Sequence, residues 1–357
     1  MIDDPLARFV IRMPKVELHV HLEGSMRPAV LLTLARKNGV RLPADDEAGL
    51  KRWFRFKDFA QFVDVYLACS RSLKDPEDFQ LLLLDVMAEQ AVQHVVYSEV
   101  HFTISTHVAA GAPAEEVRRA LDEAMAEGAR RYGVTLKLIP DIVRNMDRGR
   151  ADVTLEWALA GQGDGVVALG LSGIEAGYPN EPFREHFAAA RAAGLHRVVH
   201  AGEHGGPPSV RSALEVCEPE RIGHGVRAIE DAALVAELAE RRIPLEVCPS
   251  SNVCLGVVPS LAAHPFDRLY RSGATVTVNS DDPPFFNTNL TREYLRLHET
   301  FGYSAEELAG FALAALRCSF LPEAEKGLRE ADFRRQLADL GRELLGAPVE
   351  PRLTPAV

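Results

Sequence analysis

The chain has 357 residues, of which 47% are hydrophobic and 25% are charged, as expected for a globular protein with a large core. Its formal net charge of −11 argues against nucleic-acid or anionic-membrane binding, because the mean field of such a chain repels phosphate. Five scattered cysteines argue against a disulfide framework, and we see neither a signal peptide nor an apolar run long enough to span a membrane, so we expect a cytoplasmic protein.

Apolar, β-branched runs alternate along the chain with segments rich in Ala, Leu, Glu and Arg. The helix-like segments include residues 112–133 and 230–242, in which apolar residues recur at helical spacing. The predicted strands cover residues 16–22, 95–102, 135–143, 166–171, 197–200, 221–224, 244–248 and 274–278. Strands that alternate with helices over about 260 residues predict an α/β fold, a (β/α)₈ TIM barrel, in a single domain over residues 1–357.

The sequence after the first predicted strand bears on both the fold and the site. A doubly wound open sheet would be favoured by a glycine-rich phosphate fingerprint there, but the sequence reads LEGSMRP. Residues 45–73 predict extra helices inserted after the first strand, which would lie at the catalytic face of a barrel. They form either a lid or a small core of their own, and their aromatic residues are Trp53, Phe54, Phe56, Phe59, Phe62 and Tyr66. From residue 304 onward we predict helices that pack on the barrel.

The segment VELHVHLEG places two imidazoles, His19 and His21, in a short apolar run. Residues two apart on a strand point to the same side, so the two rings project together. In a barrel, the carboxyl ends of the strands carry the chemistry. Two imidazoles there supply half of a tetrahedral metal site, although hydrogen-bonded structural histidines would give the same pattern.

Polar residues follow other predicted strands in the same way. His200 and Glu203 lie in VVHAGEHGG, His224 lies in RIGHGV, and Asp281 and Asp282 lie in VTVNSDDPPFF. Burying so many ionisable groups without partners would be very costly, and a shared metal with a polar substrate removes that cost.

These residues predict one divalent metal ion per chain. Three neutral imidazoles and one carboxylate suit Zn²⁺, with Fe²⁺, Co²⁺ and Mn²⁺ as competitors. Asp281 is preferred to Asp282 as the carboxylate, because it is the deeper of the two. The predicted ligands are His19, His21, His200 and Asp281.

The segments LHVHLEGS, LSGIE, HAGEHGG, RIGHGV, CPSSN and VNSDDP together resemble the adenosine/adenine deaminase family of the amidohydrolase superfamily. The resemblance extends in order from Pro14 to Leu321. It implies a TIM barrel with one catalytic metal on the four ligands above. It also implies a hydrolytic reaction that replaces the 6-amino group of an adenine ring with oxygen and releases ammonia.

The same resemblance implies roles for residues around the metal. Glu203 falls where the family has its proton donor to the ring, and His224 falls on the histidine that orients or deprotonates the attacking water. Asp282 falls on the residue that holds N7, and Gly173 on the backbone group near N3. Glu23 falls where animal adenosine deaminases place an Asp that reaches the ribose.

The reaction itself requires these residue types. A metal lowers the pKa of water toward ~7. Attack on C6 pushes electrons onto N1, so an acid must protonate N1. Glu203 can supply that proton only if burial or a hydrogen bond to the ring raises its pKa. The alternative for Glu203 is an outer partner of a metal-binding histidine. The alternative for His224 is a ligand of a second metal.

Three other protein classes fit the sequence less well. Bimetallic amidohydrolases commonly use a carboxylated lysine on the fourth strand, but VVALGLSGIE contains no lysine. The other zinc deaminases use a PCxxC motif, whereas Cys248 and Cys254 lie six apart. A purine-binding protein that had lost catalysis would lack a catalytic residue, and none is missing. We therefore expect a small-molecule 6-aminopurine as the partner, and the oligomeric state stays open.

The substrate within this class is less sharply indicated. Glu23 is consistent with recognition of a substrate hydroxyl or with a salt bridge in its loop. RIGHGV resembles the adenosine branch, whereas CPSSNVCLGVV and VNSDDPPFF resemble adenine and 6-aminodeoxyfutalosine deaminases. The expected substrate is a 6-aminopurine nucleoside such as adenosine or 6-aminodeoxyfutalosine, with free adenine as the alternative. His101 and His107 either line the pocket or are structural.

Overall fold

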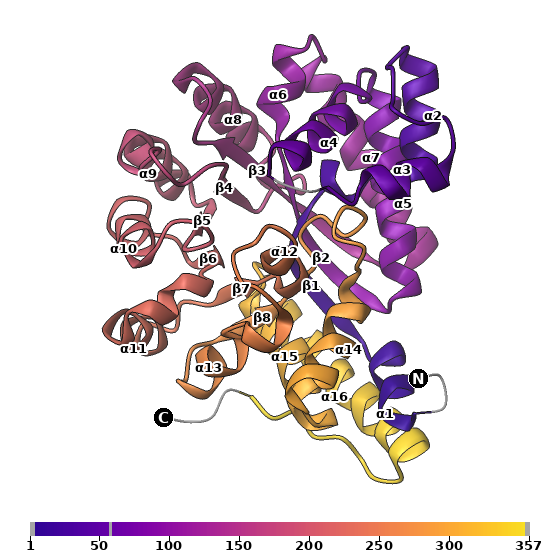
Figure 1. Ribbon diagram of the computed structural model, residues 1–357, viewed down its shortest axis with the longest axis vertical. Coiled ribbons are helices and arrows are strands. Elements are labelled where there is room, and N and C mark those ends of the chain that lie inside the picture. The colour runs from indigo at the N-terminus through magenta and orange to yellow at the C-terminus, as the bar shows by residue number, and fades with distance from the viewer. Residues whose placement is uncertain (1–3, 57–58, 354–357) are drawn as a thin grey trace.

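A computed structural model describes residues 4–56 and 59–353. Its strands are all parallel and pair in sequence order, each with the next along the chain. They are β1 (Lys15–His21), β2 (Val95–Phe102), β3 (Thr135–Val143), β4 (Ala168–Ser172), β5 (His196–Ala201), β6 (Arg221–His224), β7 (Leu245–Val247) and β8 (Val276–Val278). Figure 1 shows the helices surrounding these strands, so the predicted (β/α)₈ barrel is confirmed.

The predicted strand positions are confirmed for all eight strands, and the bounds agree for β2, β3 and β6. β8 is shorter than predicted because Ala274 belongs to the turn that ends the preceding helix, where its N–H donates to the carbonyl of Leu269. β7 begins after Pro244, whose nitrogen has no hydrogen to donate to a neighbouring strand.

The barrel closes between β1 and the residues that follow β8. Val20 forms a parallel bridge with Asp281, whose N–H donates to the carbonyl of His19 at 3.1 Å. The side-chain oxygen of Asn279 accepts from the backbone N–H groups of Leu18 and His19. Closure of the barrel therefore fixes Asp281 beside the paired histidines of β1.

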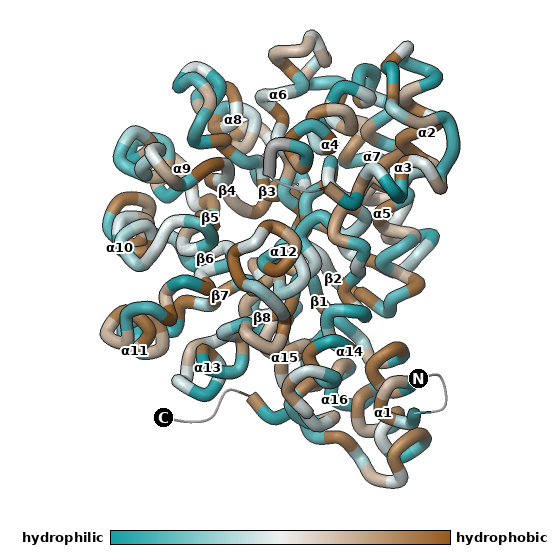
Figure 2. The backbone as a smooth tube through the Cα atoms, in the orientation of Figure 1, coloured by the Kyte–Doolittle hydropathy of each residue, from teal (hydrophilic) through white to brown (hydrophobic). Residues whose placement is uncertain are grey.

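Helices cover the outside of the barrel, and each buries its apolar side against the strands or a neighbouring helix. Along these helices, Figure 2 shows hydrophobic stretches beside hydrophilic ones. Within the described residues, no helix is both long and apolar enough to cross a membrane. The helices that follow β2 to β8 are α6 (Ile104–Ala109), α7 (Ala114–Tyr132), α8 (Arg148–Ala160), α9 (Arg184–Ala193), α10 (Pro207–Val216), α11 (Ala232–Glu240), α12 (Pro249–Cys254), α13 (Phe266–Arg271) and α14 (Leu290–Phe301).

The predicted insertion after β1 is helical. It forms α3 (Glu47–Trp53) and α4 (Phe59–Arg71), between α2 (Pro28–Asn38) and α5 (Pro76–Val92). Residues 57 and 58, and the side chains of residues 59 and 60, lie outside the described part. Of the other aromatic residues predicted there, Phe54, Phe62 and Tyr66 pack on Phe285 in the loop after β8, with ring centroids 4.9 to 6.4 Å apart. The insertion therefore contacts the loop that carries Asp281 and Asp282.

The terminal helices complete the described fold. α15 (Ala305–Cys318) contacts β1 and β8 and begins with a capping box, in which Ser304 and Glu307 satisfy each other's backbone N–H. α16 (Glu323–Leu345) packs on α1 (Pro5–Arg12). The prediction that helices after residue 304 pack on the barrel is confirmed, while a single domain over residues 1–357 stays a prediction.

Candidate active site

Four of the predicted site residues converge at the carboxyl ends of β1, β5 and β8. His19, His21, His200 and Asp281 are each at most 7% exposed. Oδ1 of Asp281 lies 3.6 Å from Nε2 of His19 and 3.3 Å from Nε2 of His21. Nε2 of His21 lies 3.3 Å from Nε2 of His200. The structure thus brings together, in one buried cluster, groups that lie as much as 262 residues apart (281 minus 19).

The hydrogen bonds of two imidazoles aim lone pairs into the cluster. Nδ1 of His200 lies 3.0 Å from the carbonyl oxygen of Leu171, which can only accept, so Nδ1 donates and Nε2 keeps its lone pair. Nδ1 of His19 lies 2.8 Å from the carboxylate of Glu246, which favours the same tautomer. Nε2 of His19 is buried without a hydrogen-bond partner among the described residues. Converging lone pairs beside a carboxylate fit a divalent cation.

The charges around the cluster also suit a cation. Burial lowers the pKa of His19, but the carboxylates of Asp281 and Glu246 outweigh it and raise that pKa to about 10. Burial would raise the pKa of Asp281, yet His19 and His21 hold it well below its ordinary value. The carboxylates therefore impose a negative field that favours a proton on His19, and a cation bound in place of that proton would experience the same field.

The backbone is shaped to allow this close approach. Asp281 and His224 have φ angles of 65° and 60°, a region that residues other than glycine rarely adopt and that is enriched at functional sites. A Cβ on Gly223 would lie 2.8 Å from Cε1 of His19, so any side chain there would displace the imidazole. Glycine in RIGHGV thus makes room for the ring of His19.

Glu203 and His224 lie beside the cluster and face each other. Nε2 of His224 is 3.8 Å from Oε2 of Glu203 and 3.9 Å from Oδ2 of Asp281. Glu203 can hold a proton only if burial or a hydrogen bond to the ring raises its pKa, and burial alone does not do so. Burial does act in that direction, but His224 and His204 outweigh it and lower the pKa. A hydrogen bond to the ring stays as the predicted means of keeping a proton on Glu203.

Asp282 has the opposite electrostatic environment. Burial and the neighbouring Asp281 raise its pKa well above the ordinary value for aspartate. Its Oδ1 is buried and has no partner within the described chain. A side chain on Gly24 would overlap this carboxyl group, so the glycine of LEGS leaves space for it. A protonated carboxyl in this position can donate a hydrogen bond to a ring nitrogen.

Glu23 is fully buried in the short 3₁₀ helix η1 (Glu23–Ser25). Its Oε1 lies 2.9 Å from Nε2 of His107 and accepts from the N–H of Thr103 at 3.0 Å. Its Oε2 has a long contact, 3.4 Å, with the hydroxyl of Tyr66 in α4. One oxygen is thus held by two short contacts within the fold, and the other by a single long one.

Gly173 lies just after β4, is exposed, and has a φ of 90°. A Cβ there would lie 2.4 Å from Oδ1 of Asn145 in the loop after β3, so the position requires glycine on two grounds. Its predicted contact with purine N3 stays a prediction.

His101 and His107 differ in their surroundings. The ring of His101 lies 4.7 Å from that of His19 and 4.9 Å from that of His21, and its Nδ1 lies 2.9 Å from Asp141. His101 therefore belongs to the wall of the cluster. The ring of His107 stacks on Phe102 at 5.5 Å, and its Nε2 contacts the carboxylate of Glu23.

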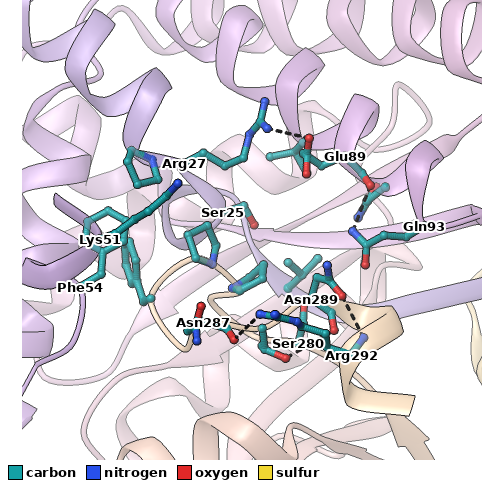
Figure 3. Close-up of a pocket in the computed structure, with 18 of the residues that line it drawn as sticks. Ser25, Arg27, Lys51, Phe54, Glu89, Gln93, Ser280, Asn287, Asn289 and Arg292 are labelled. Atoms are coloured by element: carbon teal, nitrogen blue, oxygen red, sulfur yellow. Dashed lines mark hydrogen bonds and ion pairs between the residues drawn. The ribbon is translucent and has the colours of Figure 1, made fainter. Parts of the chain in front are cut away.

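A separate cavity of about 280 Å³ (Figure 3) has none of the predicted site residues in its lining. It is lined by residues of β1, α5, the loop after β8 and α14, among them Glu17, Gln90 and Arg292. Arg27 at its edge is directed at Glu89, with which it forms an ion pair of 2.7 Å. This cavity is distinct from the cluster of predicted site residues.

Sequence reasoning gave no role to several residues that support the site. Glu246 lies within the predicted strand at residues 244–248, as His19 and His21 lie within theirs, and that placement could have suggested it. Glu175 lies in LSGIE and Asn252 in CPSSN, two segments that we quoted without assigning a function to these residues. His264 lies in no such segment, and only its contacts in the fold identify it.

A barrel with buried imidazoles and carboxylates at the carboxyl ends of its strands defines an enzyme of the amidohydrolase class. Residues 14–331 match the family model described as adenosine deaminase. An adenine deaminase of Cupriavidus metallidurans is 37% identical over 353 residues, covering 99% of this chain and 98% of that protein. An aminodeoxyfutalosine deaminase of Streptomyces avermitilis is 39% identical over 331 residues, covering 92% of both.

Among solved structures, an amidohydrolase from Burkholderia ambifaria with bound Zn superimposes with a TM-score of 0.89. It is 26% identical, and the match covers 97% of this chain and 96% of that one. The chain belongs to the adenosine deaminase family.

Proposed function

We propose that this protein is a metal-dependent hydrolase that removes the 6-amino group of a 6-aminopurine and releases ammonia. The observation that carries the proposal is the convergence of three imidazoles and the Asp281 carboxylate beside Glu203 and Asp282. Family membership and relatives named as deaminases support it.

The proposed ligands of one divalent metal ion are His19, His21, His200 and Asp281. Zn²⁺ is the preferred ion, because imidazole and carboxylate ligands suit it and because a related structure holds Zn. Fe²⁺, Co²⁺ and Mn²⁺ are the competitors. The ion would supply Lewis-acid chemistry at the attacking water.

The remaining residues would bind and orient the purine. Asp282, with its raised pKa, would donate a hydrogen bond to N7, and Glu203 would hold the proton that reaches N1. The backbone of Gly173 would contact N3. Together these contacts would align C6 with the attacking oxygen, which is the main requirement for reaction at a poor electrophile.

The substrate is proposed to be a nucleoside such as adenosine or 6-aminodeoxyfutalosine, with adenine as the alternative. Relatives named for both kinds of substrate match most of this chain. Oε2 of Glu23, which accepts only a long hydrogen bond from Tyr66, would favour a substrate that carries a hydroxyl beyond the ring. A cytoplasmic location stays a prediction.

The test is a screen of metal-loaded protein against adenosine, 6-aminodeoxyfutalosine, methylthioadenosine and adenine, with ammonia release and loss of adenine absorbance as readouts. At least one substrate should be consumed, and a protein that leaves all of them unchanged would refute the proposal. Glu203→Gln should keep its metal and lose about 10²- to 10⁴-fold in kcat. Near-normal turnover by this variant would remove Glu203 from the acid role.

A further inference from the structure

His224 is joined to a chain of buried hydrogen bonds that leads away from the proposed metal site. Its Nδ1 lies 3.4 Å from Nδ2 of Asn252, in α12. Oδ1 of Asn252 lies 3.1 Å from Nε2 of His264, just after the 3₁₀ helix η4 (Leu261–Ala263). The backbone N–H of Phe266 then donates to Nδ1 of His264 at 3.0 Å. Asn252 and His264 are 0% and 3% exposed.

The last bond of this chain sets the direction of all the others. A backbone N–H can only donate, so Nδ1 of His264 must accept and carries no proton. The ring proton of His264 is therefore on Nε2, which donates to Asn252. The Asn252 atom that faces it must be the oxygen, and this fixes the orientation of the amide. The burial that lowers the pKa of His264 to about 4 agrees with a neutral ring.

With its amide fixed, Asn252 presents its NH₂ group to His224. Nδ1 of His224 must then accept, so the single proton of the neutral ring is on Nε2. Nε2 in turn faces Oε2 of Glu203 and Oδ2 of Asp281, two carboxylate oxygens that are suited to accept. The donor and acceptor pattern is thus consistent from Phe266 to Glu203.

We propose that Asn252 and His264 are positioning residues that hold His224 in the tautomer with its proton on Nε2. His224 then acts as a hydrogen-bond donor to the oxygen of the attacking water and not as the base. If His224 gained a second proton, that proton would be on Nδ1. It would then face the N–H groups of Asn252, so that two donors would oppose each other. This inference rests on the proposed function.

The tautomer has two consequences for the reaction. As the C6–O bond forms, the proton released when the water O–H bond breaks goes to the carboxylate of Glu203, which passes it to N1. In the later step the hydroxyl group on C6 gives its proton to the amino group, the C6–N bond breaks, and ammonia leaves while the oxygen remains on C6 as the 6-oxo group. An imidazole with its proton on Nε2 also has no lone pair there for a second metal ion, which argues against the bimetallic alternative for His224.

The decisive measurement is the protonation state of each ring nitrogen in metal-loaded protein labelled with ¹⁵N-histidine. Long-range ¹H–¹⁵N correlation spectra distinguish the two tautomers, and loss of signals in His224→Gln assigns the resonances of His224. We expect the proton on Nε2 in the wild-type protein. In Asn252→Asp, the new carboxylate can only accept, so the proton of His224 should move to Nδ1. The same variant should lose roughly 10- to 100-fold in kcat with little change in KM.

Two further variants separate this role from a general effect on packing. His264→Gln keeps an amide donor near Asn252 and should retain the tautomer and most of the turnover, whereas His264→Leu should lose both. As a matched control, His186→Gln removes a buried histidine that pairs with Asp152 on α8. This control should leave the tautomer of His224 and the value of kcat unchanged.

A wild-type spectrum with the proton of His224 on Nδ1 would overturn the inference, and so would normal turnover by Asn252→Asp. If Asn252→Asp does not fold, the wild-type spectrum alone decides. A protein that shows the expected tautomer but deaminates no 6-aminopurine would refute the proposed function and leave the hydrogen-bond chain intact.

Discussion

The carboxylate of Glu175 holds the loop of Glu203 by its backbone, since its Oε1 accepts from the N–H of Glu203 at 2.9 Å. The same carboxylate also accepts from the N–H groups of Gly202, His204 and Gly205, at 2.8 to 3.1 Å. A carboxylate that accepts several backbone N–H groups makes strong, charge-assisted bonds. Glu175 thereby sets the position of the segment that carries the proposed proton donor.

Replacing Glu175 with Gln should therefore damage catalysis without removing a group that contacts the substrate. The amide loses the negative charge and one acceptor, which leaves buried N–H groups unpaired at a cost of about 1–3 kcal/mol. We expect a fall of about tenfold or more in kcat, measured by ammonia release, together with a lower melting temperature. Glu181→Gln is the control, because Glu181 is exposed and its side chain bonds only to Ser212 among the hydrogen bonds described. Equal turnover by the two variants would contradict this role.

Glu246→Gln should weaken metal binding. The Glu246 carboxylate orients His19 at 2.8 Å, and loss of such an outer partner typically costs roughly 10- to 100-fold in metal affinity. Competition with a chromogenic chelator would measure the change. Glu99→Gln is a matched control, because Glu99 and Glu246 both pair with the buried Arg221 but Glu246 is the one that contacts His19. Both variants should lose stability, but only Glu246→Gln should lose metal affinity. An equal loss of metal affinity in Glu99→Gln would contradict the prediction.

Glu23→Gln tests whether Oε2 of Glu23, the oxygen with the single long contact, selects the substrate. If Oε2 accepts a hydroxyl of a nucleoside, kcat/KM for the preferred nucleoside should fall about tenfold, equivalent to about 1.4 kcal/mol. The value for adenine, which has no sugar, should change less. Steady-state kinetics with both substrates give the ratio. Equal losses would show that Glu23 acts only through its contacts with His107 and Thr103.

The buried Lys15 should make stability depend on pH. Its Nζ donates to the carbonyls of Met13 and Gln93 at 3.0 Å, and burial lowers its pKa from 10.5 to about 7. Between these pH values the folded state binds fewer protons than the unfolded state, so the free energy of unfolding rises with pH. The largest slope is about 1.4 kcal/mol per pH unit. Denaturant titrations from pH 7 to 10 should show this rise in the wild-type protein and a flatter profile in Lys15→Met. If the wild-type protein and Lys15→Met gave parallel profiles, Lys15 would not be the source of the pH dependence.

The sequence predicted the barrel because the signals for it are local. Alternating apolar runs and helical segments depend on residues a few positions apart, and they placed all eight strands. Only the ends of the strands differed from the prediction. At Ala274, for example, the backbone N–H donates to the carbonyl of Leu269 in the turn that ends α13. The two-residue spacing of His19 and His21 likewise fixed their common direction without reference to the rest of the chain.

The tertiary structure decided what the local pattern could not encode. Asp281 reaches the histidines because the barrel closes through its backbone, and the tautomer of His224 depends on Phe266, which lies 42 residues further along the chain (266 minus 224). Burial raises the pKa of both carboxylates, but their neighbours decide the outcome: Asp282 beside Asp281 has a raised pKa, whereas Glu203 beside His224 and His204 has a lowered one. The sequence by itself determined which chemical groups are present and on which face of each strand they lie. Their partners, charges and proton positions follow from contacts between distant loops, because hydrogen bonds and electrostatic interactions depend on distance in space and not on distance along the chain.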